Sequence, residues 1–232
     1  MRTLLALIFA GLLGGCATTG GSTDPRDPWE GFNRASFEMN DKLDQAILKP
    51  VAQGYQKVVP DFAQAGVGNF FENLYDIGNG INNILQGKPA DGLSDLGRFA
   101  FNSVVGIFGL WDVATPLGLE KHNEDLGQTL AVWGVPSGPY FVIPVFGPST
   151  VRDASARPID PSFFYGYGID NLAVNLGLYV TDVVRTRANL LQAEKVLDEA
   201  ALDRYTFVRD AWLQRRRNQI FDGKPPKEAD ED

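Results

Sequence analysis

The sequence predicts a mainly all-α fold, and two observations support this prediction. Apolar residues recur at three- and four-residue steps over several long stretches, which is the spacing of one face of a helix. No long segment alternates with the period of two that is typical of a half-buried strand. The 25 glycines and 14 prolines among the 232 residues favour frequent turns and close packing between helices.

The first residues resemble a bacterial lipoprotein signal. Arg2 supplies a positive charge, residues 4–13 form an apolar stretch too short to span a bilayer, and a Leu-Gly-Gly-Cys motif ends at Cys16. Cys16 is the only cysteine, so no disulfide competes for its thiol. We expect residues 1–15 to be removed and Cys16 to carry three acyl chains, which make a permanent anchor. An ordinary signal peptide is the alternative. Under the lipoprotein interpretation, Ala17 rather than Asp after the cysteine favours the outer membrane.

The remaining chain is expected to form one domain between two polar ends. Residues 16–28 are small and polar after the lipidated cysteine and predict a tether. Residues 223–232 form an acidic tail that we expect to be disordered. No linker or repeat divides residues 29–222, so we expect a single helical domain there.

The apolar spacing predicts a series of amphipathic helices. The clearest begins at Pro89, because proline suits a first helical turn and Asp91 lies near the positive end of the helix dipole. Its opposite face carries Asp95, Arg98 and Asn102. In chain order, the apolar positions are Phe32, Met39 and Leu43; Val67, Phe70, Phe71, Leu74, Ile81, Ile84 and Leu85; Leu93, Leu96, Gly97, Ala100, Phe101, Val104, Val105 and Phe108; Leu190, Ala193, Leu197 and Ala201; and Tyr205, Val208 and Trp212.

The uncharged run at residues 126–151 requires a different structure. It is long enough to cross a bilayer as a helix, but its glycines and prolines exclude a continuous helix. Residues 130–135 and 140–146 are apolar enough for two short strands, and residues 136–139 (PSGP) would form the turn between them. We therefore predict a hairpin-like loop. A loop folded into the core of a soluble helical domain is the alternative.

Residues suited to catalysis or metal binding are few. His122 is the only histidine and stands among charged neighbours, where a solvated surface residue is typical. The sequence has no G-x-S-x-G elbow, no phosphate-binding loop and no cluster of metal ligands. The net charge of −8 argues against nucleic acid as a partner. We predict no enzyme activity, no metal, and no cofactor apart from the covalent lipid.

Four ordered blocks resemble the MlaA/VacJ family of phospholipid-binding lipoproteins. They are residues 27–40 (DPWEGFNRASFEMN), 98–115 (RFAFNSVVGIFGLWDVAT), 126–135 (LGQTLAVWGV) and 138–153 (GPYFVIPVFGPSTVRD). The similarity covers nearly all of residues 27–221. The acidic tail and details of the segment 38–45 depart from the family pattern.

The resemblance implies a ring of amphipathic helices embedded in the outer membrane, with a hairpin-like loop lining a central channel. Such a lipoprotein extracts mislocalised phospholipids from the outer leaflet and passes them to a soluble periplasmic carrier, which maintains lipid asymmetry. Members are associated with a trimeric porin. In this chain, Phe37 and Phe99 lie off the main apolar stripes and would face lipid. The channel loop matches Gly138, Pro139, Tyr140, Phe141, Pro144, Phe146 and Gly147, and the N-terminal motif matches Phe32, Asn33, Arg34 and Asn40.

Several alternatives remain open at this stage. Arg152 would contact either a phospholipid headgroup or an internal carboxylate. The three arginines at residues 215–217 suit a helix C-terminus or a docking surface for anionic lipid or an acidic partner. The protein as a whole could be a tethered scaffolding lipoprotein without lipid transport. A lipid-modifying enzyme would require His122.

Overall fold

The computed structural model describes residues 24–160 and 171–227 and confirms the mainly helical fold. The predicted signal segment and Cys16 lie outside the described residues. The elements are, in chain order, α2 (Glu30–Leu43), a π-helical turn η1 (Asp44–Leu48), α3 (Lys49–Val58), α4 (Asp61–Leu85), α5 (Pro89–Val104), η2 (Thr115–Leu117), α6 (Leu126–Val132), β1 (Tyr140–Ile143), β2 (Gly147–Thr150), α7 (Val151–Ala156), η3 (Arg157–Ile159), α8 (Leu172–Ala200) and α9 (Arg204–Ile220).

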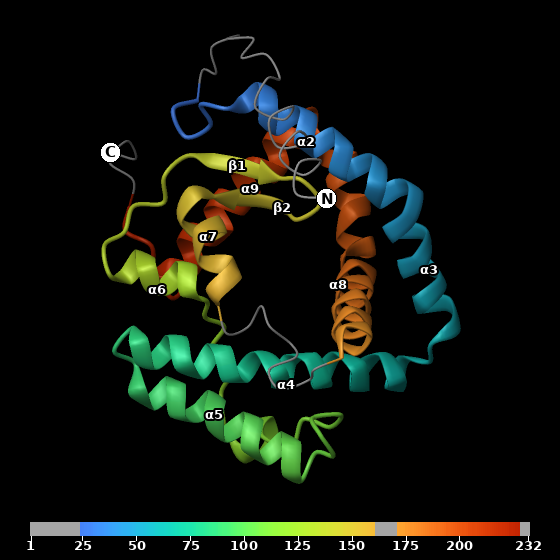
Figure 1. Ribbon diagram of the computed structural model, residues 1–232, viewed down its shortest axis with the longest axis vertical. Helices are drawn as coiled ribbons and strands as arrows, with labels where there is room; N and C mark the ends of the chain where they lie inside the picture. Colours follow the sequence, from blue (N-terminus) through green and yellow to red (C-terminus); the bar gives the residue numbers. More distant parts are fainter. Residues whose placement is uncertain (1–23, 161–170, 228–232) are drawn as a thin grey trace.

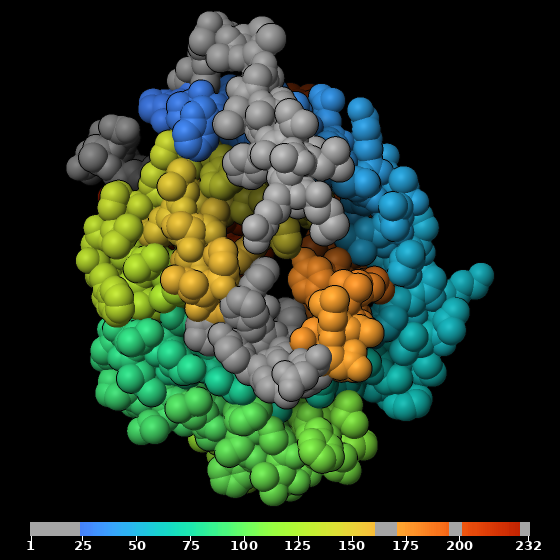
Figure 2. Space-filling view, in the orientation of Figure 1, coloured from blue at the N-terminus to red at the C-terminus, as the bar shows by residue number. Residues whose placement is uncertain are grey.

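The elements are arranged around a central space (Figure 1). The continuous run α2–η1–α3 forms one side, α4 crosses at its end, and α5 packs along the outer side of α4. Helices α6 and α7 lead back from α4 to the hairpin, which contacts α2 and closes the ring. Helix α8 packs on the inner side of α3, and α9 passes behind the hairpin. The space-filling view has the same rounded outline, with α4 and α5 together at one end (Figure 2).

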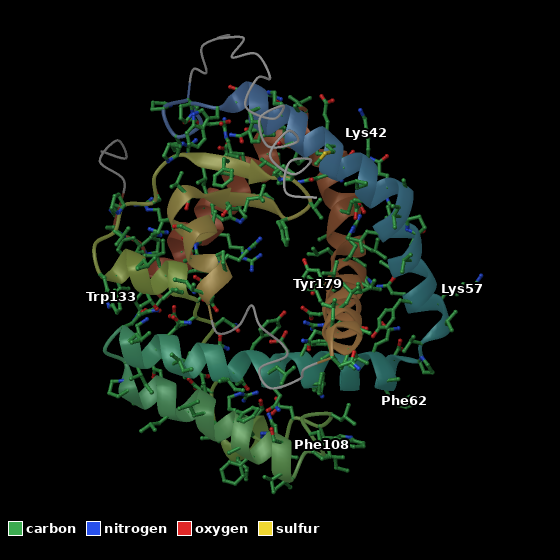
Figure 3. All side chains as sticks on the ribbon, in the orientation of Figure 1. Lys42, Lys57, Phe62, Phe108, Trp133 and Tyr179 are labelled. Atoms are coloured by element: carbon green, nitrogen blue, oxygen red, sulfur yellow. The ribbon has the colours of Figure 1, made fainter. Side chains whose placement is uncertain are left out.

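Polar side chains are buried in this ring, while large apolar ones are exposed. On α5, Asp95, Arg98 and Asn102 are buried, whereas Leu93 is 66% exposed and Val104 is 83% exposed. Helix α2 follows the same rule: its buried residues are Asn33 and Ser36, and its exposed ones include Phe32, Met39 and Leu43. The labelled Phe62 and Trp133 likewise lie at the outer edge, while Tyr179 lies on the inner side of α8 (Figure 3). The predicted apolar stripes of these helices therefore face outward.

Contact between α4 and α5 depends on two glycines. A Cβ atom on Gly80 would lie 2.9 Å from the carbonyl oxygen of Gly92, and one on Gly92 would lie 2.7 Å from the carbonyl oxygen of Gly80. The helices can approach this closely only because neither position carries a side chain. Beside them, buried Asp76 forms ion pairs with Lys121 at 2.8 Å and with Arg98 at 3.3 Å. The polar side of α4 and α5 is thus held by paired charges.

The predicted hairpin is present, but it lies later in the chain than expected. Residues 126–132 form helix α6, which includes the first half of the strand predicted at residues 130–135, and the Asp125 side chain caps this helix by accepting a hydrogen bond from Gln128 N. The strands β1 and β2 pair antiparallel, with Tyr140 opposite Thr150, and the turn between them is residues 144–146. The predicted turn at residues 136–139 precedes the first strand.

The expectation for Phe37 was wrong about which face is buried. Phe37 packs against Tyr205 with its ring centroid 5.7 Å away, so it joins the core behind the hairpin instead of facing lipid. Helix α8 buries Val184, Ala188 and Leu191, while the predicted stripe residue Leu190 is 52% exposed. No helix within residues 24–160 and 171–227 is long and apolar enough to cross a membrane.

Candidate functional site

The base of the hairpin is held by Asn33 on α2. Its side-chain Nδ2 donates to the carbonyl oxygen of Tyr140 at 3.2 Å, and its Oδ1 accepts from Val142 N at 2.8 Å. The same Nδ2 donates to buried Asp27 at 2.6 Å, and Asp27 also accepts from the Tyr205 hydroxyl at 2.5 Å. Asn33 is fully buried. The first strand is therefore tied to a closed polar network between α2 and α9.

The tip of the hairpin is held by Asn40, two helical turns further along α2. Its Nδ2 donates to the carbonyl oxygen of Ile143 at 3.1 Å, and its Oδ1 accepts from Val145 N at 2.6 Å. Residues seven apart lie on one face of a helix, so Asn33 and Asn40 bond β1 as a neighbouring strand would. Val145 has a φ of 72° and Gly147 a φ of 86°. The turn is therefore strained at Val145, and Asn40 holds that residue in place.

The predicted loop residues divide into a buried base and an exposed tip. Tyr140 is 1% exposed and packs edge-on against Trp212, with ring centroids 6.0 Å apart. Burial raises the pKa of the Tyr140 hydroxyl above its usual range. Phe141 packs edge-on against Trp29. Gly138, with a φ of 66°, and Pro139 precede the first strand, and Pro144, Phe146 and Gly147 form or flank the turn.

Arg152 forms an internal ion pair in this structure. Its Nε donates to Asp153 at 2.9 Å, and the residue is only 6% exposed. Asp153 also accepts from Arg216 Nε at 2.8 Å, and Arg216 makes two further bonds to Asp125, at 2.6 and 2.7 Å. Burial opposes the charge of Arg216, but these carboxylates raise its pKa overall. Arg216 thus joins α9 to α6 and α7, a role that the arginine run did not reveal.

The other residues of the N-terminal motif have different surroundings. Arg34 pairs with Glu30 at 2.8 Å and Asp203 at 2.7 Å, and its guanidinium lies 4.5 Å from the centre of the Tyr205 ring. Phe32 is 48% exposed on the outer side of α2. The structure therefore brings Asn33 and Asn40 to the hairpin, while Arg34 links α2 to α9 and Phe32 contributes to the outer surface.

A cavity of about 340 Å³ lies beside the hairpin, between α2, η1, α8 and α9. Part of its wall is charged: Arg187 pairs with Asp44 and with Glu194, at 2.6 Å in each case, and Arg204 pairs with Glu194 at 3.1 Å. Its apolar lining comes from Phe37, Val142, Pro148, Leu190, Ala193 and Val208. The cavity is therefore amphipathic, which suits a ligand with both polar and apolar parts.

The sequence pattern did not assign Arg187, Leu190 or Ala193 to this cavity. Leu190 and Ala193 were placed on one helix face, but no local signal indicates that this face borders a cavity. His122 lies at the opposite end of the ring, where its Nδ1 is 3.5 Å from an oxygen of Asp95. Among the described residues, no group of three or more His, Cys, Asp or Glu side chains could hold a metal ion.

The fold and this site define a class of helical ring proteins with a polar interior, an apolar exterior and a hairpin fastened to the ring wall. Comparisons with known proteins agree. The profile of the MlaA lipoprotein family matches residues 25–219. The chain belongs to this MlaA lipoprotein family.

Individual relatives extend the comparison. The intermembrane phospholipid transport system lipoprotein MlaA of Escherichia coli is 35% identical over 209 residues, which cover 88% of this chain and 82% of that protein. The Haemophilus influenzae protein of the same name is 29% identical, over 95% of this chain and 91% of that protein. A chain solved in work on the structural basis for maintenance of bacterial outer membrane lipid asymmetry superposes with a TM-score of 0.68. It is 33% identical, and the match covers 85% of this chain and 99% of that one.

Proposed function

We propose that this protein is an outer-membrane lipoprotein that extracts mislocalised phospholipids from the outer leaflet and passes them to a periplasmic carrier, which maintains lipid asymmetry. The relatives named as intermembrane phospholipid transport lipoproteins support this proposal. The observation that carries it is the inverted distribution of side chains, with buried polar residues and exposed large apolar ones.

This distribution has a direct physical meaning. A charged or zwitterionic headgroup cannot cross hydrocarbon without a polar lining, because unpaired polar groups there cost several kcal/mol. Polar residues such as Asp76, Arg98 and Asn102 are turned away from the outside of the ring. Exposed residues such as Phe101, Val104 and Phe108 would be unfavourable in water but favourable against acyl chains. The buried polar residues pack between α4, α5 and the segment that follows α5, so the exterior suits hydrocarbon, while the charged cavity wall formed by Arg187 and Glu194 supports a polar route inside the ring.

The hairpin is the proposed gate of this route. It borders the amphipathic cavity through Val142, Gly147 and Pro148, and its exposed tip is fastened to α2 through Asn40. A lipidated Cys16 would anchor the ring, and a trimeric porin and a soluble periplasmic carrier are the proposed partners. Transport of this kind requires no catalytic group, so the protein is proposed to be no enzyme.

The central test measures phospholipid directly. We expect protein purified in mild detergent to contain phospholipid by mass spectrometry, and deletion of the gene to raise phospholipid in the outer leaflet. Absence of bound phospholipid together with an unchanged leaflet composition would contradict the proposal. The scaffolding alternative predicts that a Cys16→Ala protein without residues 1–15 is monodisperse in water, whereas the exposed apolar face predicts dependence on detergent.

A substitution at the turn tests the gate separately. Gly147 has a φ of 86°, and a Cβ atom added there would have no atom within 4 Å, so Gly147→Val adds backbone strain without a clash. Such strain costs roughly 1–3 kcal/mol and would displace the turn, so we expect transfer to fall while the ring stays folded. Gly134→Val is the matched control, because Gly134 has a φ of 88° and equally open surroundings outside the hairpin. Equal phospholipid transfer in the two variants would show that the turn has a packing role and does not gate transport.

A further inference from the structure

Arg157 differs from the other arginines that lie within the body of the ring. Ion pairs to carboxylates are formed by Arg98, Arg152, Arg185, Arg187 and Arg216. Arg157 is half-buried, yet within the described ranges no carboxylate pairs with it. Its guanidinium instead faces Phe146, whose ring centroid lies 5.8 Å from the guanidinium carbon. Desolvated charges are normally paired, so a partly buried arginine with no carboxylate partner among the described residues stands out.

The position of Arg157 is fixed by its backbone. It caps the C-terminus of α7, where its N–H donates to the carbonyl oxygen of Asp153, and its own carbonyl accepts from Asp160 N at 3.3 Å. Helix α7 lies inside α6, next to the central space (Figure 1). The guanidinium of Arg157 faces the hairpin turn next to Gly147 and Pro148, which line the cavity, and it donates to no carboxylate of the described residues.

The partner of Arg157 lies at the exposed turn of the hairpin. Phe146 is 46% exposed and stands between two residues of positive φ, Val145 and Gly147. The hydrogen bond that reaches this turn from the ring wall is the one from Val145 N to Asn40. A guanidinium over a phenyl ring makes a weaker contact than a guanidinium that donates two parallel hydrogen bonds to a phosphate. A phosphate that reaches Arg157 would therefore displace Phe146.

We propose that Arg157 binds the phosphate of a phospholipid headgroup, and that Phe146 covers Arg157 until the lipid arrives. This inference rests on the proposed function, since it assigns one contact on the same route. It accounts for the lack of a carboxylate partner among the described residues, because a permanent anionic partner would compete with the phosphate. It also links headgroup arrival to the tip of the hairpin, because the residue displaced lies at the turn.

The test compares lipids with and without a phosphate on the full-length lipidated protein in mild detergent. The probes are a short-chain phosphatidylethanolamine, a diacylglycerol with the same chains, and inorganic phosphate. We expect Arg157→Gln to weaken phosphatidylethanolamine binding about tenfold, as befits one charge-assisted contact, and to leave diacylglycerol binding unchanged. Arg157→Lys keeps the charge but loses the paired donors, so it should weaken phosphatidylethanolamine binding less than Arg157→Gln does. Arg215→Gln, on the exposed surface of α9, is the matched control and should bind as the wild type does.

A second variant has an expected effect of opposite sign. Phe146→Leu removes the ring that competes for Arg157, so phosphatidylethanolamine should bind severalfold more tightly. A folding defect would not produce such a gain, so this variant decides the matter if Arg157→Gln does not fold. Unchanged or weaker binding by Phe146→Leu would overturn the inference.

The remaining outcomes separate this inference from the proposed function. Equal loss of both lipids in Arg157→Gln, or no loss at all, would overturn the role of Arg157 while leaving lipid transport standing. Competition by inorganic phosphate at the concentration of the short-chain lipid would indicate a site for free anions and would also overturn it. A wild-type protein that binds neither lipid would overturn the proposed function, and the inference with it.

Discussion

Replacing Asn40 by leucine should release the hairpin tip without unfolding the ring. The change removes the bond from Val145 N to Oδ1, at 2.6 Å, and the bond from Nδ2 to the carbonyl oxygen of Ile143, at 3.1 Å. A protein hydrogen bond contributes about 1 kcal/mol net, so the two together hold the tip by roughly 2 kcal/mol. That free energy corresponds to a rise of about 30-fold in the fraction of molecules with an open tip.

Hydrogen exchange at single-residue resolution measures this effect. The Val145 amide should exchange about 30-fold faster in Asn40→Leu, while the amides between α4 and α5 should exchange as in the wild type. Asn40→Asp keeps an acceptor for Val145 N but loses the donor to Ile143, so it should give an intermediate rate. An unchanged Val145 amide would refute the restraint that we assign to Asn40. A uniform rise over the whole protein would refute its local character.

Unlike the change at Asn40, a change at Asn33 should lower the stability of the whole protein, and the other predictions also concern the stability of the ring. Asn33→Leu should cost about 3 kcal/mol or more in denaturant unfolding, because the change leaves buried polar groups without partners. Gly80→Ala should destabilise the protein by about 1–3 kcal/mol through its clash with α5, whereas Gly54→Ala, with no atom within 4 Å, should be neutral or slightly stabilising. Arg216→Gln should cost about 1–3 kcal/mol, since it leaves Asp125 without its ion pair while Asp153 keeps Arg152 as a partner. A hydrogen bond from Arg26 lowers the pKa of Asp24 from 3.8 to about 2. The ionised carboxylate therefore contributes about 1 kcal/mol to the free energy of unfolding above pH 4, and this contribution should disappear as the pH falls through 2. In Asp24→Asn, the dependence of unfolding on pH should lack that step.

Local sequence patterns were sufficient for the helices whose faces differ strongly. Pro89 and the spacing from Leu93 onward predicted α5, and the structure buries the polar residues of that helix against α4 and residues 112–122. The sequence pattern did not predict whether the apolar face of each helix points inward or outward. Periodicity shows that a helix has two faces, and only the arrangement of neighbouring helices determines which face is covered.

The misplacement of the hairpin has a specific physical cause. Residues 136–139 contain two prolines and a glycine, which is a stronger local turn signal than the turn actually formed around Val145. A β-branched residue with positive φ is unfavourable by itself. It is held by Asn40, which is 105 positions away in the sequence, so no short window could reveal it. The burial of Leu191 instead of Leu190 is likewise decided by contact between α8 and α3.

The outward-facing apolar residues have a consequence for the time before the protein reaches its final location. Phe62, Val104 and Phe108 are 77–83% exposed, and they belong to a longer series of exposed apolar side chains on α2 to α5 and on the segment that follows α5. In water, such a surface drives self-association. A newly made chain that folded into this ring in an aqueous compartment would aggregate unless another apolar surface covered it. If the outer face lies against hydrocarbon, as proposed above, delivery has to be coupled to folding: either an escort shields the outer face in transit, or the ring closes only when hydrocarbon is available to surround it.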